Sequence, residues 1–137
     1  MSPKTLCLFT ACIWMLGACT HPAPNTATGD TTSPDRAQLV QQYEAIVRQA
    51  QSVPCTNAGE WRITPIGKKA CGGPAAYIAY SSRIDTARFL QQVAAYTAAS
   101  ERYNRDSGMV SDCMLVTEPK GVQCVNGQAV LSNERHD

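Results

Sequence analysis

The sequence predicts an α+β fold: two amphipathic helices packed on a small antiparallel sheet and stapled by two disulfides. Two segments, near residues 34–51 and 85–105, repeat apolar residues at helical spacing. Shorter segments, at 60–66 and again within 109–131, carry β-branched and other apolar residues between turn-forming residues. Four cysteines lie in the same part of the chain, which is small enough for cross-links to matter. Short strands joined by tight turns, together with two helices, are typical of the α+β class.

The beginning of the chain has the form of an export signal. Lys4 precedes an apolar run from Leu6 to Leu16, which is much shorter than the roughly 20 residues of a spanning helix. Small residues follow, as at a signal cleavage site. The order Leu16-Gly17-Ala18-Cys19 resembles the lipobox of bacterial lipoproteins. This resemblance implies that residues 1–18 are a signal peptide and that Cys19 is acylated and becomes the N-terminus. The alternative is an ordinary secreted protein with Cys19 as a thiol.

A lipid-modified Cys19 would hold the protein at a membrane through its acyl chains. An Asp directly after the cysteine is the familiar inner-membrane retention signal of Gram-negative lipoproteins, and Thr20 stands there instead. In a Gram-negative host the resemblance therefore implies the outer membrane, at its periplasmic face or at the cell surface. Residues 19–33 lack large apolar side chains and are expected to form a disordered tether. Such a tether averages roughly 20 Å from end to end.

The first helix is predicted at 34–51. Ser33 is a suitable N-cap, Pro34 suits the first helical position, and Asp35 complements the positive end of the helix dipole. Apolar residues then recur at helical spacing until Pro54, which prevents the helix from continuing.

A strand and a tight turn are predicted after this helix. Residues 60–66 alternate apolar and polar side chains, and Pro65 places this strand at a sheet edge. The sequence Cys71-Gly72-Gly73-Pro74 predicts a tight turn, because two glycines permit backbone conformations closed to other residues. Residues 75–81 fit either a helix or a strand.

The second helix, predicted from Asp85 to about residue 105, has the clearest start in the chain. Asp85 is a suitable N-cap, and Ile84 before it can pack on Phe89 as a hydrophobic staple. Gly108 lies just beyond the end, where glycine commonly terminates a helix.

The remainder is predicted to be β-structure. Asn126-Gly127 is a strong hairpin signal. The predicted strands are 109–116, 122–125 and 128–131, with a turn at 118–121 between the first two. Residues 34–132 would then form a single domain, and residues 133–137 a frayed tail.

Four cysteines remain once Cys7 and Cys12 leave with the signal peptide and Cys19 is acylated. An even number in a short exported chain indicates a disulfide framework, for which three pairings are possible. We predict the two pairings that close local loops: Cys55–Cys71 and Cys113–Cys124. A zinc site is disfavoured, because no Cys-x-x-Cys pair occurs and export favours oxidation.

Composition excludes several classes of function. Removal of Lys4 leaves eleven basic and eleven acidic side chains, so nothing indicates nucleic-acid binding. The mature chain has histidines only at positions 21 and 136, outside the predicted folded part, which argues against histidine-assisted nucleophiles and histidine metal sites. No phosphate-binding or dinucleotide motif occurs, and no cofactor is expected. Carboxylates are what an acid–base enzyme could still use: Glu60, Asp85, Glu101, Asp106, Asp112 and Glu118.

The best candidate for a binding site is the segment 67–81. It combines Lys68 and Lys69 with a cross-linked turn and with Tyr77 and Tyr80, and such residues on a rigid loop suit a protein or glycan partner. Trp61 is a further candidate. The alternative interpretation is that the glycines serve the turn, the aromatic residues pack in the core and the lysines are solvated. A binding role predicts that the lysines and tyrosines are exposed.

A second resemblance covers about residues 55–131. The chain resembles a group of small exported bacterial proteins in a succession of motifs: W-x-I, G-K-K-A-C-G-G-P-x-x-Y-I-A-Y-S, Y-x-x-A-x-x-x-Y-N, S-D-C and C-V-N-G-x-A-V. That group implies the domain boundary and no site. We therefore expect a non-enzymatic, lipid-anchored envelope protein that binds a protein or an envelope polymer, for instance as a hydrolase inhibitor. The alternatives are a structural envelope component without a discrete ligand and a carboxylate-based hydrolase.

Overall fold

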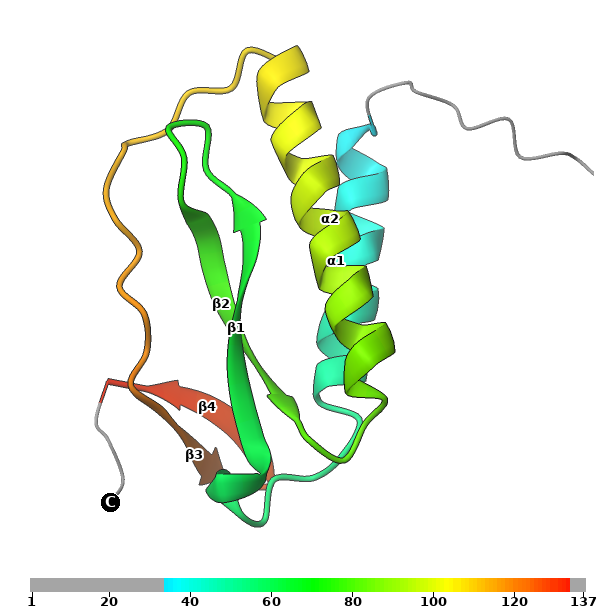
Figure 1. Cartoon of the computed structure of the whole chain (residues 1–137), viewed down its shortest axis with the longest axis vertical. Helices are drawn as coiled ribbons and strands as arrows, with labels where there is room; N and C mark the ends of the chain where they lie inside the picture. The colour runs from blue at the N-terminus through cyan, green and yellow to red at the C-terminus, as the bar shows by residue number, and fades with distance from the viewer. Residues whose placement is uncertain (1–33, 134–137) are drawn as a thin grey trace, which may run out of the picture. The chain divides into compact units, whose positions relative to one another are not determined.

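The computed structural model describes residues 34–133. The predicted signal peptide, Cys19, the tether and residues 134–137 lie outside the described residues. Within the described residues, two helices and two antiparallel hairpins follow one another, which confirms the α+β class (Figure 1). The elements are α1 (Arg36–Ala50), a 3₁₀ turn η1 (Ala58–Glu60), β1 (Trp61–Lys68), β2 (Pro74–Ser81), α2 (Thr86–Asp106), β3 (Gly121–Val125) and β4 (Gln128–Ser132).

Helix α1 begins at Arg36 with Asp35 as its N-cap, two residues later than predicted. The Asp35 carboxylate accepts a hydrogen bond from the Gln38 N–H at 2.7 Å. The prediction that Ser33 caps this helix is wrong, because Asp35 is an equally good cap and already holds the extended backbone of a cap residue. Ser33 itself lies outside the described residues.

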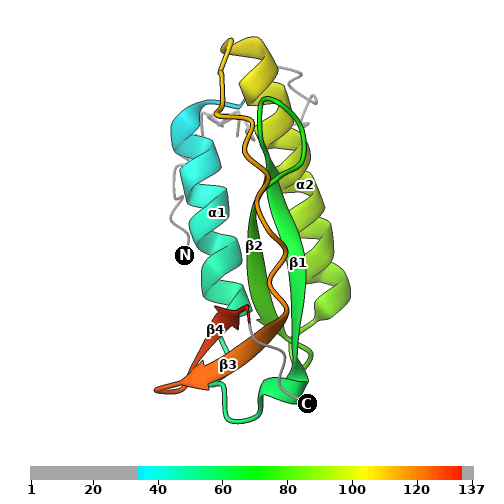
Figure 2. The same cartoon turned by 90° about the vertical axis from the view of Figure 1, so that its left-hand side faces the viewer.

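Strands β1 and β2 form an antiparallel hairpin around the predicted glycine turn, in which Gly72 and Gly73 have φ of 97° and 73°. The segment 75–81, ambiguous in the sequence, lies entirely within β2. Pro65 is in β1 and occupies an edge position as predicted, since within residues 34–133 this sheet has only two strands. Side chains alternate between the cluster beneath the helices and the cluster beneath the second hairpin. Figure 2 shows the β1–β2 hairpin in front of the two helices.

Helix α2 begins where the sequence predicted. Asp85 accepts a hydrogen bond from the Arg88 N–H at 3.0 Å, and Ile84 packs against the cluster that contains Phe89. Near its other end the helix meets the tip of the β1–β2 hairpin at Gly67. The Gly67 N–H donates to Thr97 Oγ1 at 3.0 Å, and a Cβ on Gly67 would lie 3.1 Å from the Ala75 Cβ.

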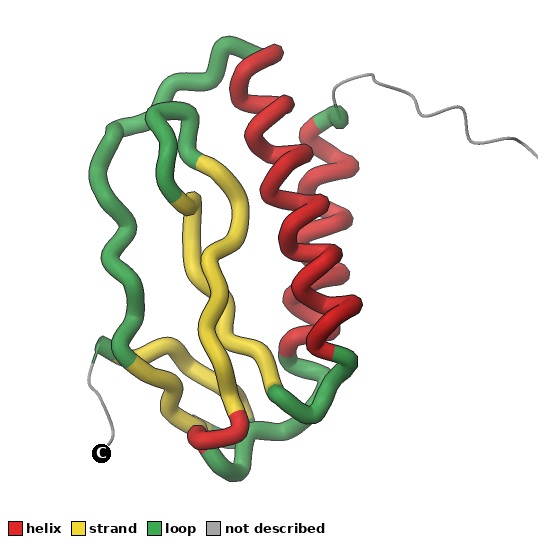
Figure 3. Tube along the Cα trace, viewed as in Figure 1, coloured by secondary structure: helices red, strands yellow, loops and turns green. Residues whose placement is uncertain are grey.

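Residues 109–120 form no strand, so the prediction of a strand at 109–116 is wrong. The segment runs as a loop from the end of α2 to β3 (Figure 3). Apolar composition is not sufficient for a strand, because a strand also needs a partner for its backbone groups. Cys113, with φ of 53°, also interrupts the extended backbone. The β3–β4 hairpin is confirmed, with positive φ at Asn126 and Gly127 as its turn requires.

The hairpin β1–β2 separates two hydrophobic clusters. The first, between the hairpin and the helices, contains Ile46, Ala50, Ile66, Ile78, Tyr80, Phe89 and Val93. The second, between the outer face and the second hairpin, contains Cys55, Trp61, Ala79, Val122 and Ala129. The predicted single sheet is therefore two hairpins, each too small to bury both of its faces without the other elements.

The disulfides pair Cys55 with Cys124 and Cys71 with Cys113. The predicted pairings, Cys55–Cys71 and Cys113–Cys124, are wrong. They assumed closure of local loops, whereas the observed bridges join positions 69 and 42 residues apart. The second hairpin folds back to the chain that leaves α1, where the Cys55 N–H donates to the Gly127 carbonyl at 2.8 Å. That contact places Cys124, and not Cys71, beside Cys55.

Candidate functional site

The five residues predicted for binding fall into separate environments. Lys68 is the last residue of β1, and Lys69 follows it beside the glycine turn. Tyr77 is half-buried in β2. Tyr80 and Trp61 are buried, at 8% and 5% exposure. The prediction that they form a binding surface is therefore wrong for Tyr80 and Trp61, whose side chains pack in the two core clusters.

The pleat of the hairpin explains this burial. Tyr80 points toward the helices, where its ring centroid lies 4.9 Å from that of Phe89. Trp61 points to the opposite face and packs within the second cluster. Tyr80 packs the hairpin against the helices, and Trp61 packs it against the second hairpin. They lie on opposite faces because side chains alternate along each strand.

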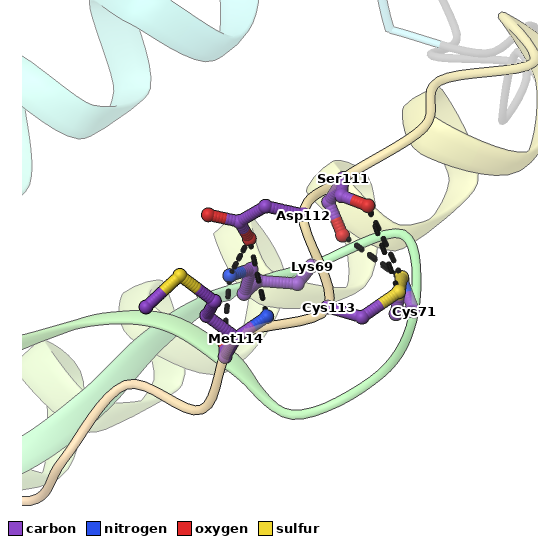
Figure 4. Close-up of a disulfide and its surroundings, with 6 residues drawn as sticks. All are labelled: Lys69, Cys71, Ser111, Asp112, Cys113 and Met114. Carbon is purple, nitrogen blue, oxygen red and sulfur yellow. Dashed lines mark hydrogen bonds and ion pairs between the residues drawn. A yellow bond between two sulfur atoms is a disulfide. The ribbon is translucent and has the colours of Figure 1, made fainter.

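Lys69 connects the hairpin turn to the loop that follows α2. Its ammonium donates hydrogen bonds to Asp112 Oδ1 and to the Met114 carbonyl, the second at 2.7 Å (Figure 4). The Lys69 side chain is only 16% exposed, because the loop covers it. A lysine that the sequence marked as a partner contact is therefore a structural bridge within the domain.

The Cys71–Cys113 disulfide fastens the same loop to the turn (Figure 4). Asp112 adds a local bond by accepting from the Met114 N–H at 3.3 Å. At the start of the loop, the Met109 N–H donates to the Asn104 carbonyl at 3.0 Å. We call residues 109–116 the stapled segment, because a covalent bond, the Lys69 bridge and these contacts fix its position.

The stapled segment holds large apolar side chains in solvent. Val110, Met114 and Leu115 are 88%, 69% and 91% exposed. Single exposed apolar residues are ordinary on a protein surface, but several within a few residues of an immobilised loop point to an interaction site. This site was not predicted from the sequence, because residues 109–116 were expected to form a strand. The available signal was the pattern itself, in which apolar pairs flank Ser111-Asp112-Cys113 without strand alternation.

Lys68 lines a different feature, an open cavity of about 430 Å³ between the hairpin tip and the end of α2. Glu101, Asn104 and Arg105 line it from the helix. The Asn104 amide donates to the Lys68 carbonyl at 2.6 Å and so fixes the hairpin against the helix. Within residues 34–133 the Lys68 ammonium forms no ion pair. Lys68 is therefore the one predicted lysine whose charge is available to a partner from this side of the hairpin.

Two side chains have shifted pKa values. The hydrogen bond from Lys69 lowers the pKa of Asp112, and the Met114 N–H and the positive charge of Lys69 act in the same direction. Burial, with a smaller contribution from nearby Tyr43, raises the pKa of Tyr96 in α2. The lowered pKa of Asp112 reflects its bond to Lys69 within the stapled segment. The raised pKa of Tyr96 reflects packing between the helices, where the Tyr43 and Tyr96 rings lie 5.7 Å apart.

Residues 34–133 contain no group of His, Cys, Asp and Glu side chains arranged to hold a metal ion. In the same part of the chain, neither helix has the length and apolar character that crossing a membrane requires.

Comparison of the sequence with protein-family models and with curated proteins finds no match, and comparison with solved structures finds none.

Proposed function

We propose that this protein is a lipid-anchored lipoprotein of the bacterial cell envelope that binds another macromolecule and catalyses no reaction. Cys19 is its lipid attachment site, and the outer membrane is its location. The partner is a protein or an envelope polymer, for instance a hydrolase that the lipoprotein inhibits. The order Leu16-Gly17-Ala18-Cys19 supports the anchor, and the stapled segment supports binding.

The observation that carries the binding role is the immobilised, exposed apolar surface of the stapled segment. Binding normally requires loops to lose conformational freedom, which subtracts from affinity. Here the Cys71–Cys113 bridge and Lys69 have already ordered the segment in the unbound protein. Val110, Met114 and Leu115 can therefore enter a cleft of a partner without an ordering penalty of their own.

Both disulfides agree with an exported protein. Disulfides form and persist outside the reducing cytoplasm, and small exported domains depend on them because their cores are limited. This supports the envelope location and is independent of the N-terminal motif.

The binding role is tested by crosslinking in intact envelopes. Cells would produce the full-length protein, the variant Leu115→Lys, and the control Leu90→Lys, which changes an exposed leucine on α2. A crosslinked partner of the native protein should disappear with Leu115→Lys and persist with Leu90→Lys, as measured by mass spectrometry. If Leu115→Lys captures the same partners as the native protein, the stapled segment is not the binding surface.

The anchor is tested separately by metabolic labelling with a radioactive fatty acid. The native chain should incorporate the label and fractionate with outer membranes, whereas Cys19→Ser should remain unlabelled and at full precursor length. Labelling that persists in Cys19→Ser would contradict the proposed attachment site.

A further inference from the structure

The sheet formed by β1 and β2 is narrower than the pair of helices that covers it. Two helices packed about 10 Å apart cover roughly four strands at their spacing of about 4.8 Å. Only two strands lie beneath α1 and α2 among the described residues. In Figure 2 α1 lies beyond the outer edge of β2, on the side away from β1, whereas α2 lies behind β1.

A groove of about 390 Å³ occupies the position where a third strand would lie. One side is lined by Tyr43 and Val47 of α1 and by its C-cap residue Gln51, at a spacing that continues one stripe of the helix. Val130 and Leu131 of β4 line the opposite side. The floor between them is the edge of β2, from Tyr77 to Ala79, and none of the lining residues is charged.

The edge of β2 presents main-chain hydrogen-bonding groups to this groove. The Ser82 N–H donates to the Glu60 carbonyl at 2.7 Å, so Glu60 and Ser82 are a hydrogen-bonded pair. In an antiparallel hairpin every second pair is hydrogen-bonded, and the register of β1 and β2 extends this alternation along both strands. The pairs Pro65–Tyr77 and Ile63–Ala79 are consequently the ones whose backbone groups point away from the partner strand. Pro65 has no N–H, and at this position no hydrogen bond between the strands is lost, because its backbone nitrogen points away from β2.

Tyr77 and Ala79 therefore direct their N–H and C=O groups toward the groove. No strand within residues 34–133 pairs with this edge. Ala79 is nevertheless buried by the surrounding elements, and a buried backbone group without a hydrogen-bond partner is costly. An extended polypeptide can satisfy these groups, because it carries backbone donors and acceptors at the spacing of a neighbouring strand.

We propose that this groove, which we call the strand groove, binds an extended polypeptide segment of another protein as a third strand on β2. The added strand forms main-chain hydrogen bonds with Tyr77 and Ala79. Its side chains alternate between the α1 stripe on one face and Val130 and Leu131 on the other. The uncharged lining selects a segment of alternating apolar and small polar residues without charges.

The remaining parts of this chain do not match the groove. Residues 20–33 (THPAPNTATGDTTS) contain two prolines and no large apolar residue to pack against Tyr43 and Val47. Residues 134–137 are mostly charged. The apolar run 6–16 belongs to the predicted signal peptide. The occupant is therefore assigned to a second polypeptide, and the inference does not rest on the stapled segment or on lipidation.

The test uses the full-length protein and two synthetic peptides. The first is a fluorescent seven-residue peptide of alternating threonine and valine, and the second is the same peptide methylated on alternate backbone nitrogens. Methylation removes main-chain donors and keeps the side chains. The unmodified peptide should bind saturably, and the methylated peptide should bind at least about tenfold more weakly, because each lost neutral hydrogen bond changes affinity about fivefold.

Two matched pairs of variants locate the site. Val130→Lys places a charge in the groove, whereas Val125→Lys changes an equally exposed valine of the same hairpin outside it, at 45% and 46% exposure. Only Val130→Lys should weaken binding of the peptide. Tyr77→Pro removes a donor that faces the groove, and Tyr77→Ala keeps that donor, so the proline variant should bind more weakly than the alanine variant.

Several results would overturn the proposal. Equal binding of both peptides, equal effects of the two valine variants, or no saturable binding of the unmodified peptide would each do so. Slow amide exchange at Tyr77 and Ala79 without peptide, lost when residues 20–33 are deleted, would assign the groove to the chain's own tether. A dimer in sedimentation that Val130→Lys dissociates would assign it to a second copy. Loss of peptide binding leaves the envelope crosslinks of the stapled segment unaffected, so the two proposals fail independently.

Discussion

The two disulfides of this domain occupy contrasting regions. Cys55–Cys124 lies within the second hydrophobic cluster, where Cys55 is buried with Trp61 and Val122. Cys71–Cys113 is exposed on both sides and joins a turn to a loop. One bridge completes a core that the second hairpin could not build alone, and the other fixes a surface. The same covalent bond thus contributes to the stability of the fold in one region and to the order of a candidate binding surface in the other.

Removing each bridge should have unequal effects on stability. The closed loops, of 69 and 42 residues, predict similar chain-entropy terms of about 4 kcal/mol. Cys55→Ala with Cys124→Ala should lose at least about 4 kcal/mol, because buried packing is also lost. Cys71→Ala with Cys113→Ala should lose only about 2 kcal/mol of stability. Without this bridge the loop 109–120 gains conformational entropy in the folded state as well, which offsets part of the entropy gained by the unfolded chain. Equal losses in urea unfolding would remove the distinction between the two regions.

Limited reduction should distinguish the bridges kinetically. A thiolate reaches the exposed Cys71–Cys113 bridge more readily than the bridge within the cluster. Peptide mapping after partial treatment with dithiothreitol should find thiols at positions 71 and 113 first. Amide exchange should then increase in the stapled segment, while β3 and β4 remain protected. Simultaneous opening of both bridges would show that the exposed region has no separate stability.

The stability of the β1–β2 hairpin, to which the stapled segment is fastened, depends on Gly67. Gly67 has φ of 70°, and an added Cβ would lie 3.1 Å from the Ala75 Cβ and 3.4 Å from the Tyr96 ring. Gly67→Ala should therefore cost about 2 kcal/mol or more in stability. Gly72→Ala, at φ of 97° with open space around it, should cost about 1 kcal/mol, from backbone strain alone. The two melting temperatures check this difference, and equal values would contradict the close approach at Gly67.

The smallest expected effect is on the pH dependence of the stapled segment. The pKa of Asp112 is lowered from its ordinary value of 3.8, so its bond to Lys69 is fully present above that pH and is lost as the pH falls through the lowered pKa. After correction for intrinsic rates, amide exchange near Met114 should accelerate in that range. Asp112→Asn should show fast exchange already at neutral pH and no acid step; an acid step that survives in this variant would assign the titration to another group.

Local signals predicted most of the elements. Helix α2 was found from its cap and staple, and the β3–β4 hairpin from Asn126-Gly127, because neighbouring residues determine both features. The strand proposed at 109–116 and the disulfide pairing failed because both depend on contacts between distant parts of the chain. The ambiguity of 75–81 had the same cause, since pairing with β1 makes that segment a strand.

The candidate sites were less predictable than the fold. The sequence located Lys68 and Lys69 beside the glycine turn, but it could not show that Lys69 turns inward to Asp112. The sequence alone does not show whether Trp61 and Tyr80 are exposed or buried. They are buried because other elements pack on both faces of the β1–β2 hairpin. The strand groove joins α1, β2 and β4, so no single segment carries a signal for it.

Disulfide mapping of the protein isolated from envelopes tests the central claim most directly. Digestion without reduction, followed by mass spectrometry, should yield peptides that join Cys55 to Cys124 and Cys71 to Cys113, with Cys19 acylated at the N-terminus of the chain. Peptides that join Cys55 to Cys71 and Cys113 to Cys124, or thiols at these four positions, would contradict the account, in which one disulfide stabilises the core and the other orders the stapled segment.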